Sequence, residues 1–386
     1  MPGRRKVLLA MSGGVDSSVA AALLLRDGYD VVGCFMRLGS PGETLETPLP
    51  ASQCKPARIG KQGCCSINDA ADARQVAAQL GIPFYVCNFK KDFGRIMDYF
   101  VEEYAAGRTP NPCVRCNDWL KFGKLHEYAQ QLGCEFVASG HYARIDNGRL
   151  YRGLDHDKDQ SYVLFGVPRE RLSHMVLPIG WMRKADVRLM AKEFNLPVFD
   201  KPDSQEICFI PDNDYAGFLE RRRPELAAAG SIIDSTGASI GVHAGQHRFT
   251  IGQRRGVPLS LGRRVYITSR DAGSNTVRVG TREDLLSHGC IVAEANWLLD
   301  EVPDGAECRV MYRYNSLPVR AKTVVLPDSS APTHSGRAGR FGVTFDDPQM
   351  AVAPGQALVV YGEDDRVLGG GWIESVRPAT SRLPSS

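Results

Sequence analysis

A short segment near the N-terminus combines glycine, serine and aspartate directly after an apolar run. Ser12-Gly13-Gly14-Val15-Asp16-Ser17-Ser18 follows Val7-Leu8-Leu9-Ala10-Met11. Glycines adopt backbone conformations closed to other residues and let a phosphate approach the main chain, while serine hydroxyls and first-turn helix amides donate hydrogen bonds to it. The segment therefore predicts a nucleotide-phosphate site, against the alternative of a plain glycine turn. The sequence contains no GxxxxGK[ST] motif, which excludes the usual P-loop.

Two prolines stiffen a second loop, Thr109-Pro110-Asn111-Pro112-Cys113-Val114-Arg115-Cys116-Asn117. The loop places Cys116 just before a predicted helix, where the helix dipole, Arg115 and Lys121 favour the thiolate. A nucleophile or a persulfide acceptor requires that form. The C-x-x-C spacing of Cys113 and Cys116 also fits half of a zinc site, but no second ligand pair follows at a suitable distance.

A further cysteine lies in Lys201-Pro202-Asp203-Ser204-Gln205-Glu206-Ile207-Cys208-Phe209-Ile210-Pro211. A cysteine among apolar neighbours is usually a small core residue. With Asp203-Ser204 ahead of it and Cys116 upstream, we interpret Cys208 as one of two thiols that meet across the nucleotide site. One thiol would carry sulfur and the other would resolve a disulfide. The eleven cysteines, an odd number, argue against a disulfide scaffold.

Composition limits the class of protein. A domain has about 150 residues, so the length of 386 residues predicts two or three domains. The apolar runs stop far short of the about 20 residues that cross a bilayer, so we expect a cytoplasmic protein without a targeting segment or membrane contact. The net charge is only +3, so a nucleic-acid surface must come from local clusters of arginine and lysine. Four such clusters are Arg221-Arg222-Arg223, Arg254-Arg255, Arg263-Arg264, and Arg309 with Arg313.

The first half of the chain alternates strand-like and helix-like segments, which predicts an α/β fold with a doubly wound parallel sheet. The expected strands are 7–11, 31–36, 84–89 and 135–139, and the expected helices are 17–27, 68–80 and 117–132. The ligand is expected at the carboxyl ends of the strands, where the first loop lies. Residues 39–63 lack periodicity and are expected to form a long mobile insertion.

The composition changes near Pro211, and residues 212–274 are rich in glycine and arginine, as in a small irregular domain. Later segments, such as 319–325 and 357–361, alternate as β-strands do and predict a closed or nearly closed barrel. The expected domains are therefore a catalytic domain at 1–211, a small central domain at 212–274 and a β-barrel at 275–379, with a frayed tail at 380–386.

Five motifs carry a resemblance to known families. The first loop resembles the pyrophosphate loop of N-type ATP pyrophosphatases, which split ATP to AMP and pyrophosphate while adenylating a substrate. The motifs are, in order, Met11 to Ser18, Gly140-His141-Tyr142-Ala143-Arg144, Asp157-Lys158-Asp159-Gln160-Ser161-Tyr162, Asp203 to Phe209 and Phe249-Thr250-Ile251-Gly252-Gln253-Arg254-Arg255-Gly256. Their order and their spread over nearly the whole chain resemble the bacterial tRNA-specific 2-thiouridylases. That family implies a pyrophosphatase domain, a small central domain and a C-terminal β-barrel that binds tRNA.

The resemblance also implies roles for individual residues. It implies that Cys116 is the nucleophile and that Cys208 bears the persulfide. The implied ATP-binding residues are Ala10, Met11, Ser12, Gly13, Gly14, Val15, Asp16, Ser17, Met36 and Gly140. The implied tRNA-binding residues are Asn111, Pro112, Cys113, His141, Lys158, Asp159, Gln160, Arg313, Tyr314 and Gln356.

The chain departs from the family pattern at two of these positions. Many members have Gly where this chain has Ala10, and Asp where it has Cys113. A third thiol beside Cys116 and Cys208 leaves two alternatives open: an iron–sulfur cluster on the three cysteines, or a persulfide relay with Cys113 as an auxiliary thiol. Cys64 and Cys65, after the loop that contains Cys54, could also pair or bind metal, but we expect Cys65 to pack at a helix start and the others to be incidental.

The implied reaction replaces the carbon-2 oxygen of the wobble uridine in tRNA by sulfur. ATP adenylates that oxygen, with Mg²⁺ on the phosphates and Asp16 helping to hold it. The Cys208 persulfide delivers sulfur, and Cys116 attacks it to leave a disulfide that an external reductant opens. The partners are the tRNA anticodon stem-loop, with the base flipped out, and a cysteine desulfurase or sulfur-relay protein as donor. Two other classes compete: a synthetase that adenylates a small metabolite, and a non-catalytic RNA-binding protein.

Overall fold

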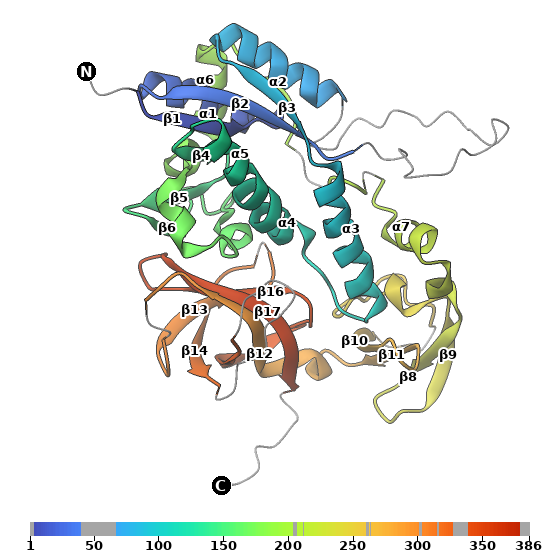
Figure 1. Cartoon of the computed structure of the whole chain (residues 1–386). Helices are drawn as coiled ribbons and strands as arrows, with labels where there is room; N and C mark the ends of the chain where they lie inside the picture. Colours follow the sequence, from blue (N-terminus) through green and yellow to red (C-terminus); the bar gives the residue numbers. More distant parts are fainter. Residues whose placement is uncertain are drawn as a thin grey trace, which may run out of the picture. The chain divides into compact units, whose positions relative to one another are not determined.

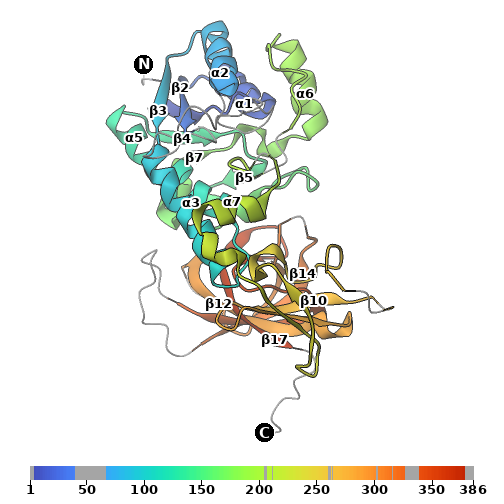
Figure 2. The same cartoon turned by 90° about the vertical axis from the view of Figure 1, so that its right-hand side faces the viewer.

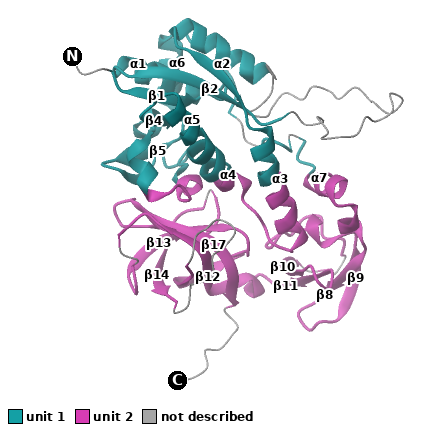
Figure 3. Cartoon of the chain, viewed as in Figure 1, with its two compact units in different colours: residues 1–96, 116–161, 170–214 teal, residues 97–115, 162–169, 215–386 magenta. Residues whose placement is uncertain are grey.

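The structure is a computed structural model that describes residues 4–39, 67–203, 207–210, 212–259, 262, 264–300, 303–314, 316–326 and 339–378. The chain forms two compact units (Figure 3). Unit 1 comprises residues 1–96, 116–161 and 170–214, and unit 2 comprises residues 97–115, 162–169 and 215–386. Several predictions lie outside the described residues: the insertion after Gly39 with Cys54, Cys64 and Cys65, the arginine at 263, and the tail at 380–386.

A five-stranded parallel sheet runs through the described part of unit 1 in the order β3-β2-β1-β4-β7 (Figure 1). Its strands are β1 (Lys6–Ala10), β2 (Asp30–Arg37), β3 (Phe84–Asn88), β4 (Phe136–Ser139) and β7 (Met175–Val176). Val7, Leu8 and Leu9 are fully buried, as a continuous apolar run in a sheet covered on both faces requires. The predicted α/β class with a parallel sheet is confirmed.

Helices cover both faces of this sheet. On one face, α1 (Val15–Arg26), α2 (Ile67–Leu80) and α6 (Lys184–Glu193) share a hydrophobic core with alternate residues of β1. On the opposite face lies α5 (Leu125–Gln131), below the sheet in Figure 1. Neither α6 nor α3 (Lys90–Ala105) was expected from the sequence.

The segment that leads into α5 departs from a regular helix. After the short α4 (Pro112–Arg115), residues Cys116–Lys124 form a π-helix, labelled η2. The single helix expected at 117–132 is therefore a π-helix followed by α5. Such stretches are rare and often occur at functional sites.

A two-residue turn makes a hairpin that periodicity did not predict. Strands β5 (Ala143–Asp146) and β6 (Arg149–Arg152) pair antiparallel through Asn147 and Gly148, whose φ angles are 48° and 68°. Asn-Gly is the preferred sequence for a turn with two such angles. The short 3₁₀ helices are η3 (Ser161–Leu164), η4 (Arg169–His174), η5 (Pro178–Trp181), η6 (Pro224–Ala227), η7 (Gln246–Arg248) and η8 (Glu283–Leu285).

Unit 2 contains a small sheet that follows α7 (Tyr215–Arg222). In its described residues the order is β10-β11-β8-β9. The strands are β8 (Gly230–Ile233), β9 (Ser239–His243), β10 (Tyr266–Asp271) and β11 (Thr276–Gly280). Ile232, Ile267 and Val277 form its core. Because β11 pairs with both β8 and β10, this sheet extends past residue 274.

The C-terminal part of unit 2 contains a closed antiparallel barrel in the order β12-β15-β14-β13-β16-β17, which Figure 2 shows from a second direction. Its strands are β12 (Leu286–Trp297), β13 (Glu307–Met311), β14 (Val319–Val325), β15 (Phe341–Met350), β16 (Ala357–Tyr361) and β17 (Val367–Pro378). Closure pairs each of the six described barrel strands with a neighbour on both sides, and the interior is filled by residues such as Val292, Val310 and Val360. The predicted barrel is confirmed. In the part of the chain that is described, no helix has the length and apolarity to cross a membrane.

Candidate functional site

The loop after β1 is shaped by glycines at two close backbone approaches. Gly13 has φ +75°, and a Cβ on it would lie 2.2 Å from the carbonyl oxygen of Asp69. Gly140, just after β4, lies against the start of α1, where a Cβ would come within 2.7 Å of the Ser17 nitrogen. Both positions therefore need glycine to bring loop, helix and neighbouring strand end together.

Serine hydroxyls fix the shape of the same loop. The Ser17 hydroxyl lies 3.2 Å from both the Ser12 nitrogen and the Ser12 hydroxyl, and the Ser18 hydroxyl donates to the Gly14 carbonyl at 2.8 Å. Gly14 is the N-cap of α1, and no side chain in the described residues caps this helix. An uncapped helix start beside serine hydroxyls is the arrangement that binds phosphate in many proteins.

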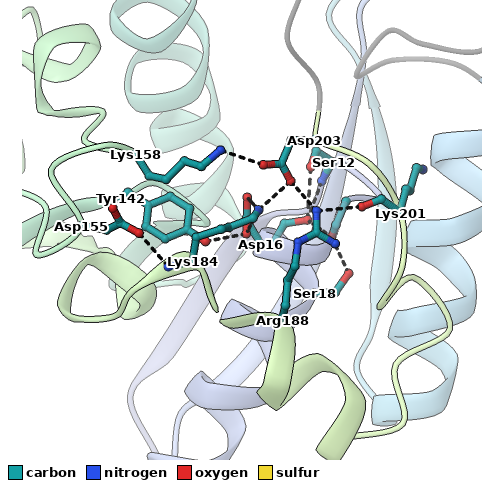
Figure 4. A network of polar contacts seen from close by, with 12 residues as sticks. Ser12, Asp16, Ser18, Tyr142, Asp155, Lys158, Lys184, Arg188, Lys201 and Asp203 are labelled. Carbon is teal, nitrogen blue, oxygen red and sulfur yellow. Dashed lines mark hydrogen bonds and ion pairs between the residues drawn. The ribbon is translucent and has the colours of Figure 1, made fainter. Parts of the chain in front are cut away.

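Lys184 of α6 contacts the loop helix directly (Figure 4). Its ammonium donates to both carboxylate oxygens of Asp16, at 2.8 and 2.9 Å, and the Tyr142 hydroxyl donates to one of them at 2.8 Å. Burial and the nearby Asp16 carboxylate raise the pKa of Tyr142, so this hydroxyl stays a proton donor. Asp16 therefore sits between a cation and a neutral donor.

Asp203 is the second carboxylate of this network (Figure 4). Its oxygens accept from Lys184 at 2.8 Å, Arg188 at 2.8 Å and Lys158 at 3.1 Å. Burial opposes ionisation of this carboxyl, but the hydrogen bonds from Lys184 and Lys158 outweigh it and hold the pKa of Asp203 at about 2. The carboxylate is thus charged throughout the neutral range.

Lys201 holds the loop from the other side. Its ammonium donates to the Gly13 carbonyl at 3.0 Å and to the carboxylates of Asp69 and Asp72, both at 2.6 Å. Burial disfavours the ammonium, yet the hydrogen bonds to these two carboxylates raise the pKa of Lys201. The loop therefore has lysines from two different segments bound to it.

Cys116 and Cys208, the two cysteines predicted to take part in sulfur transfer, both belong to unit 1 and are half-buried. Cys116 is the first residue of the π-helix. Cys208 precedes Phe209, whose ring packs against Phe93 with centroids 5.6 Å apart. Cys113 is exposed in unit 2. Among the described residues, no group of three or more His, Cys, Asp or Glu side chains is arranged to hold a metal ion.

The described contacts of the predicted tRNA-contact residues of unit 1 are to other residues of the same unit, although Lys158 and Gln160 are only partly buried. Asp159 is 7% exposed and bonds Arg152, the amides of Gly153 and Ser161, and the Ser161 hydroxyl. His141 is 6% exposed and lies between Ser139 and Lys121. The Gln160 carbonyl accepts from the Tyr142 amide. These side chains hold the ends of β4 and β5 in place, and Lys158 belongs to the charged network.

In unit 2, three predicted positions stabilise the loop before Cys116. The Asn111 side chain accepts from the Val114 amide at 3.3 Å, next to the buried Pro112, and Gln356 donates to the Thr109 carbonyl at 3.0 Å. Tyr314 is 39% exposed and packs on Tyr162, with Arg313 beside Tyr312. Among the arginine clusters, Arg254, Arg255 and Arg264 are exposed. Arg222 and Arg223 are exposed too, and they and the partly buried Arg309 form ion pairs.

Three cations of this site were missed from the sequence: Lys184, Arg188 and Lys201. One signal was available. Lys184 is the first residue of α6 and Arg183 is its N-cap, although the positive end of a helix disfavours cations there. Residues that break a local rule of this kind often serve a functional site. Lys201 and Arg188 gave no comparable signal, because their partners come from distant segments.

The chain matches three family models. They are the tRNA methyl transferase HUP domain at residues 5–212, the tRNA methyl transferase PRC-barrel domain at 216–281 and the aminomethyltransferase beta-barrel domain at 287–373. Curated relatives named tRNA-specific 2-thiouridylase MnmA match nearly full length. That of Rhodopirellula baltica is 48% identical over 95% of this chain and 96% of its own. That of Carboxydothermus hydrogenoformans is 44% identical over 96% of this chain and 98% of its own.

Likeness to solved structures is weaker. An NMN synthetase from Francisella tularensis aligns with 58% of this chain and 78% of its own, at 17% identity and a TM-score of 0.32. A 4-thiouridine synthetase–RNA complex with bound ATP aligns with 57% of this chain and 51% of its own, at 16% identity and a TM-score of 0.34.

Proposed function

The chain belongs to the family of tRNA-specific 2-thiouridylases, ATP-using enzymes of tRNA thiolation, and we propose that it replaces the carbon-2 oxygen of the wobble uridine by sulfur. The observation that carries this proposal is the loop from Ser12 to Ser18. Its glycines leave the backbone open to a phosphate, its serines and the uncapped α1 supply donors, and lysines flank it.

In the proposed activation step, ATP binds along Ala10 to Ser17, with Met36 and Gly140 near the adenosine. The carbon-2 oxygen of the base attacks the α-phosphorus, pyrophosphate leaves, and the oxygen becomes part of an AMP leaving group. Asp16, whose carboxylate oxygens accept from Lys184 and Tyr142 in the structure, is the residue that would hold Mg²⁺, since this ion is usually held by one or two carboxylates, phosphate oxygens and water. When bound, it neutralises phosphate charge.

In the proposed sulfur step, a donor such as a cysteine desulfurase or a sulfur-relay protein loads Cys208 as a persulfide. The terminal sulfur attacks carbon 2 and AMP departs. The Cys116 thiolate attacks the inner sulfur and breaks the sulfur–sulfur bond, which leaves a disulfide between Cys116 and Cys208. An external reductant then supplies two electrons to restore both thiols.

We assign binding of the tRNA anticodon stem-loop to the loop at Asn111, Pro112 and Cys113 and to the barrel positions Arg313, Tyr314 and Gln356. At His141, Lys158, Asp159 and Gln160 the described contacts are internal, which supports an indirect role in shaping the RNA surface. The exposed Arg254 and Arg255 suit phosphate contacts.

We also propose three functional domains: catalysis at 1–211, a central domain, and tRNA binding by the barrel up to 379. The three matched family models support this division. The pairing of β11 with β8 and β10 supports moving the second boundary from 274 to a point after Gly280. We expect the enzyme to act in the cytoplasm, where its tRNA substrate is.

Pyrophosphate release with and without tRNA tests the function. We expect ATP to be split at the α-phosphorus only when tRNA with an unmodified wobble uridine is present, and that tRNA to gain 2-thiouridine when a persulfide donor is added. Release stimulated by a small metabolite instead would favour the synthetase class. No release under any condition would favour a non-catalytic RNA-binding protein.

A further inference from the structure

One carboxylate, Asp203, accepts from three cations. Lys184 and Arg188 donate to one oxygen at 2.8 Å each, and Lys158 donates to the other at 3.1 Å. The three cations come from two separate segments, α6 and the loop after β6. Figure 4 shows them converging on Asp203 from different directions. Asp203 is therefore shared by three cations, of which Lys184 also pairs with Asp16.

One of these cations, Lys184, also contacts the start of α1 at the nucleotide loop. Lys184 bridges Asp203 and Asp16, and Asp16 is in the first turn of α1, just after Gly14. On the opposite side, Lys201 binds the Gly13 carbonyl. The side chains of Lys184 and Asp203 are only 11% and 24% exposed. Salt therefore screens the attraction between their charges less than it screens an ion pair on the surface.

A triphosphate fits this set of cations better than a single carboxylate does. It carries several negative charges and many more acceptor oxygens, and charge-assisted hydrogen bonds from lysine and arginine to phosphate are among the strong ones. Arginine and lysine donors would keep their charge during the exchange, so only the acceptor changes. Asp203 thus occupies donors that suit phosphate.

We propose that Lys184, Arg188 and Lys158 are the cations that bind the phosphates of ATP and that Asp203 is an internal substitute that holds them until ATP arrives. ATP binding then exchanges Asp203 for phosphate oxygens on these donors. The inference rests on the proposed function only in placing ATP at the Ser12 to Ser18 loop. It predicts that Asp203 competes with nucleotide rather than assisting it.

The test is the affinity of the full-length protein for the non-hydrolysable analogue α,β-methylene-ATP with Mg²⁺, measured by calorimetry without tRNA. Asp203→Asn removes the competing charge and is expected to tighten binding about tenfold, since one charged hydrogen bond contributes about 1.5 kcal/mol. Lys184→Gln and Arg188→Gln are each expected to weaken binding about tenfold or more. Lys158→Gln should weaken it by a smaller factor, because its bond to Asp203 is the longest of the three.

Two control variants separate these effects from changes in net charge. Asp200→Asn removes an exposed carboxylate from the same segment, and Lys192→Gln removes an exposed cation from the same helix. Both should bind the analogue as the wild type does. The double variant Asp203→Asn/Lys184→Gln should bind the analogue more tightly than Lys184→Gln alone, but by a smaller factor than Asp203→Asn gains over the wild type, because Asp203 then competes only for Arg188 and Lys158.

The inference is overturned if Asp203→Asn, with an unchanged melting temperature, weakens analogue binding, which would make Asp203 a supporting ligand. It is equally overturned if Lys184→Gln and Arg188→Gln bind like the wild type. Such results, in a protein that still thiolates tRNA, would leave the proposed function intact. Failure of the wild type to release pyrophosphate with tRNA would instead count against the proposed function, whatever the variants bind.

Discussion

The Glu294 carboxylate accepts a hydrogen bond from the Arg115 guanidinium at 2.9 Å. Glu294 belongs to β12 and has a positive φ of +51°. Glu294 lies where the pairing register of β12 with β17 shifts, so a bulge directs this side chain. The Arg115 side chain is 5% exposed and lies over the rings of Trp372, at 4.2 Å, and Tyr99, at 5.0 Å. The barrel thus fixes the residue that directly precedes Cys116.

Removing Glu294 should destabilise unit 2. Glu294→Ala leaves the Arg115 charge buried without its carboxylate partner, which costs about 3 kcal/mol, and Glu294→Gln, which keeps an acceptor, should cost less. Denaturant unfolding followed by tryptophan fluorescence measures this. The matched control is Glu374→Ala, which breaks an exposed barrel pair with Arg340 and should cost less than about 1 kcal/mol. Equal losses for Glu294→Ala and Glu374→Ala would contradict the assigned role of burial.

Gly13→Ala should abolish nucleotide binding. The new Cβ would collide with the Asp69 carbonyl, 2.2 Å away, and the positive φ adds backbone strain of about 1 kcal/mol. Gly28→Ala is the control, because Gly28 also has a positive φ, +84°, but open space around it. Calorimetric titration with the ATP analogue should show loss of binding for Gly13→Ala alone. Binding that survives in Gly13→Ala would mean that the loop tolerates a side chain and that its closeness to Asp69 is dispensable.

Cys87 should react with alkylating agents at lower pH than an ordinary thiol. The Cys34 thiol donates to the Cys87 sulfur at 3.0 Å, and this hydrogen bond lowers the pKa of Cys87, whereas burial partly opposes it. A lowered pKa means more thiolate at neutral pH and faster alkylation. Iodoacetamide labelling, followed by peptide mass spectrometry across a pH series, measures the rate at each cysteine.

Cys34, the donor of the hydrogen bond to Cys87, provides the control. Cys34→Ala removes the donor and should move the labelling profile of Cys87 to higher pH, whereas Cys34→Ser keeps a donor and should move it less. The pKa of Cys34 itself is raised by the same hydrogen bond and by burial, so Cys34 should label slowly. A Cys87 profile that is identical in Cys34→Ala and the wild type would contradict the thiol pair.

Arg254→Ala/Arg255→Ala should weaken tRNA binding and its dependence on salt. Both side chains are exposed, and each lost phosphate contact lowers the slope of log affinity against log salt by about 0.7 to 0.9. Filter binding over a salt series measures both quantities. Arg222→Ala/Arg223→Ala is the control, since these arginines form ion pairs with Asp98 and Glu225. An unchanged slope in the Arg254/Arg255 variant would remove this surface from the tRNA interface.

Local patterns were sufficient for much of the fold. The apolar run at Val7 to Met11 and the Gly/Ser/Asp segment after it predicted β1, its loop and α1, because each depends on neighbours in sequence. The hairpin at Asn147-Gly148 carried a local signal that periodicity alone passes over. The π-helix at Cys116–Lys124 could not be predicted, since its residues suit an α-helix equally well.

The charged part of the site depends on long-range contacts. Lys184 and Asp16 are far apart in sequence, and only the packing of α6 beside α1 brings them within 2.8 Å. Asp159 also depends on contacts that its motif does not indicate, because its buried carboxylate accepts from four donors within unit 1. Motifs identify residues that matter, whereas burial and partners decide what each does.

The cysteine variants test the sulfur step separately from activation. Cys116→Ser and Cys208→Ser should each abolish 2-thiouridine formation while tRNA-dependent pyrophosphate release continues, because neither thiol takes part in adenylation. Cys113→Ser should retain thiolation if the exposed Cys113 is only an auxiliary thiol. Cys134→Ser, at a buried thiol whose pKa burial raises, controls for general effects of losing a cysteine.

Anaerobic purification with iron and sulfide analysis completes this test. Full activity of iron-free protein, with Cys113→Ser as active as the wild type, is the outcome expected for a persulfide relay. Loss of activity in Cys113→Ser together with stoichiometric iron in the wild type would instead support a cluster on Cys113, Cys116 and Cys208. Because a serine cannot carry a persulfide, full thiolation by Cys208→Ser would count against both mechanisms and require another sulfur-bearing residue.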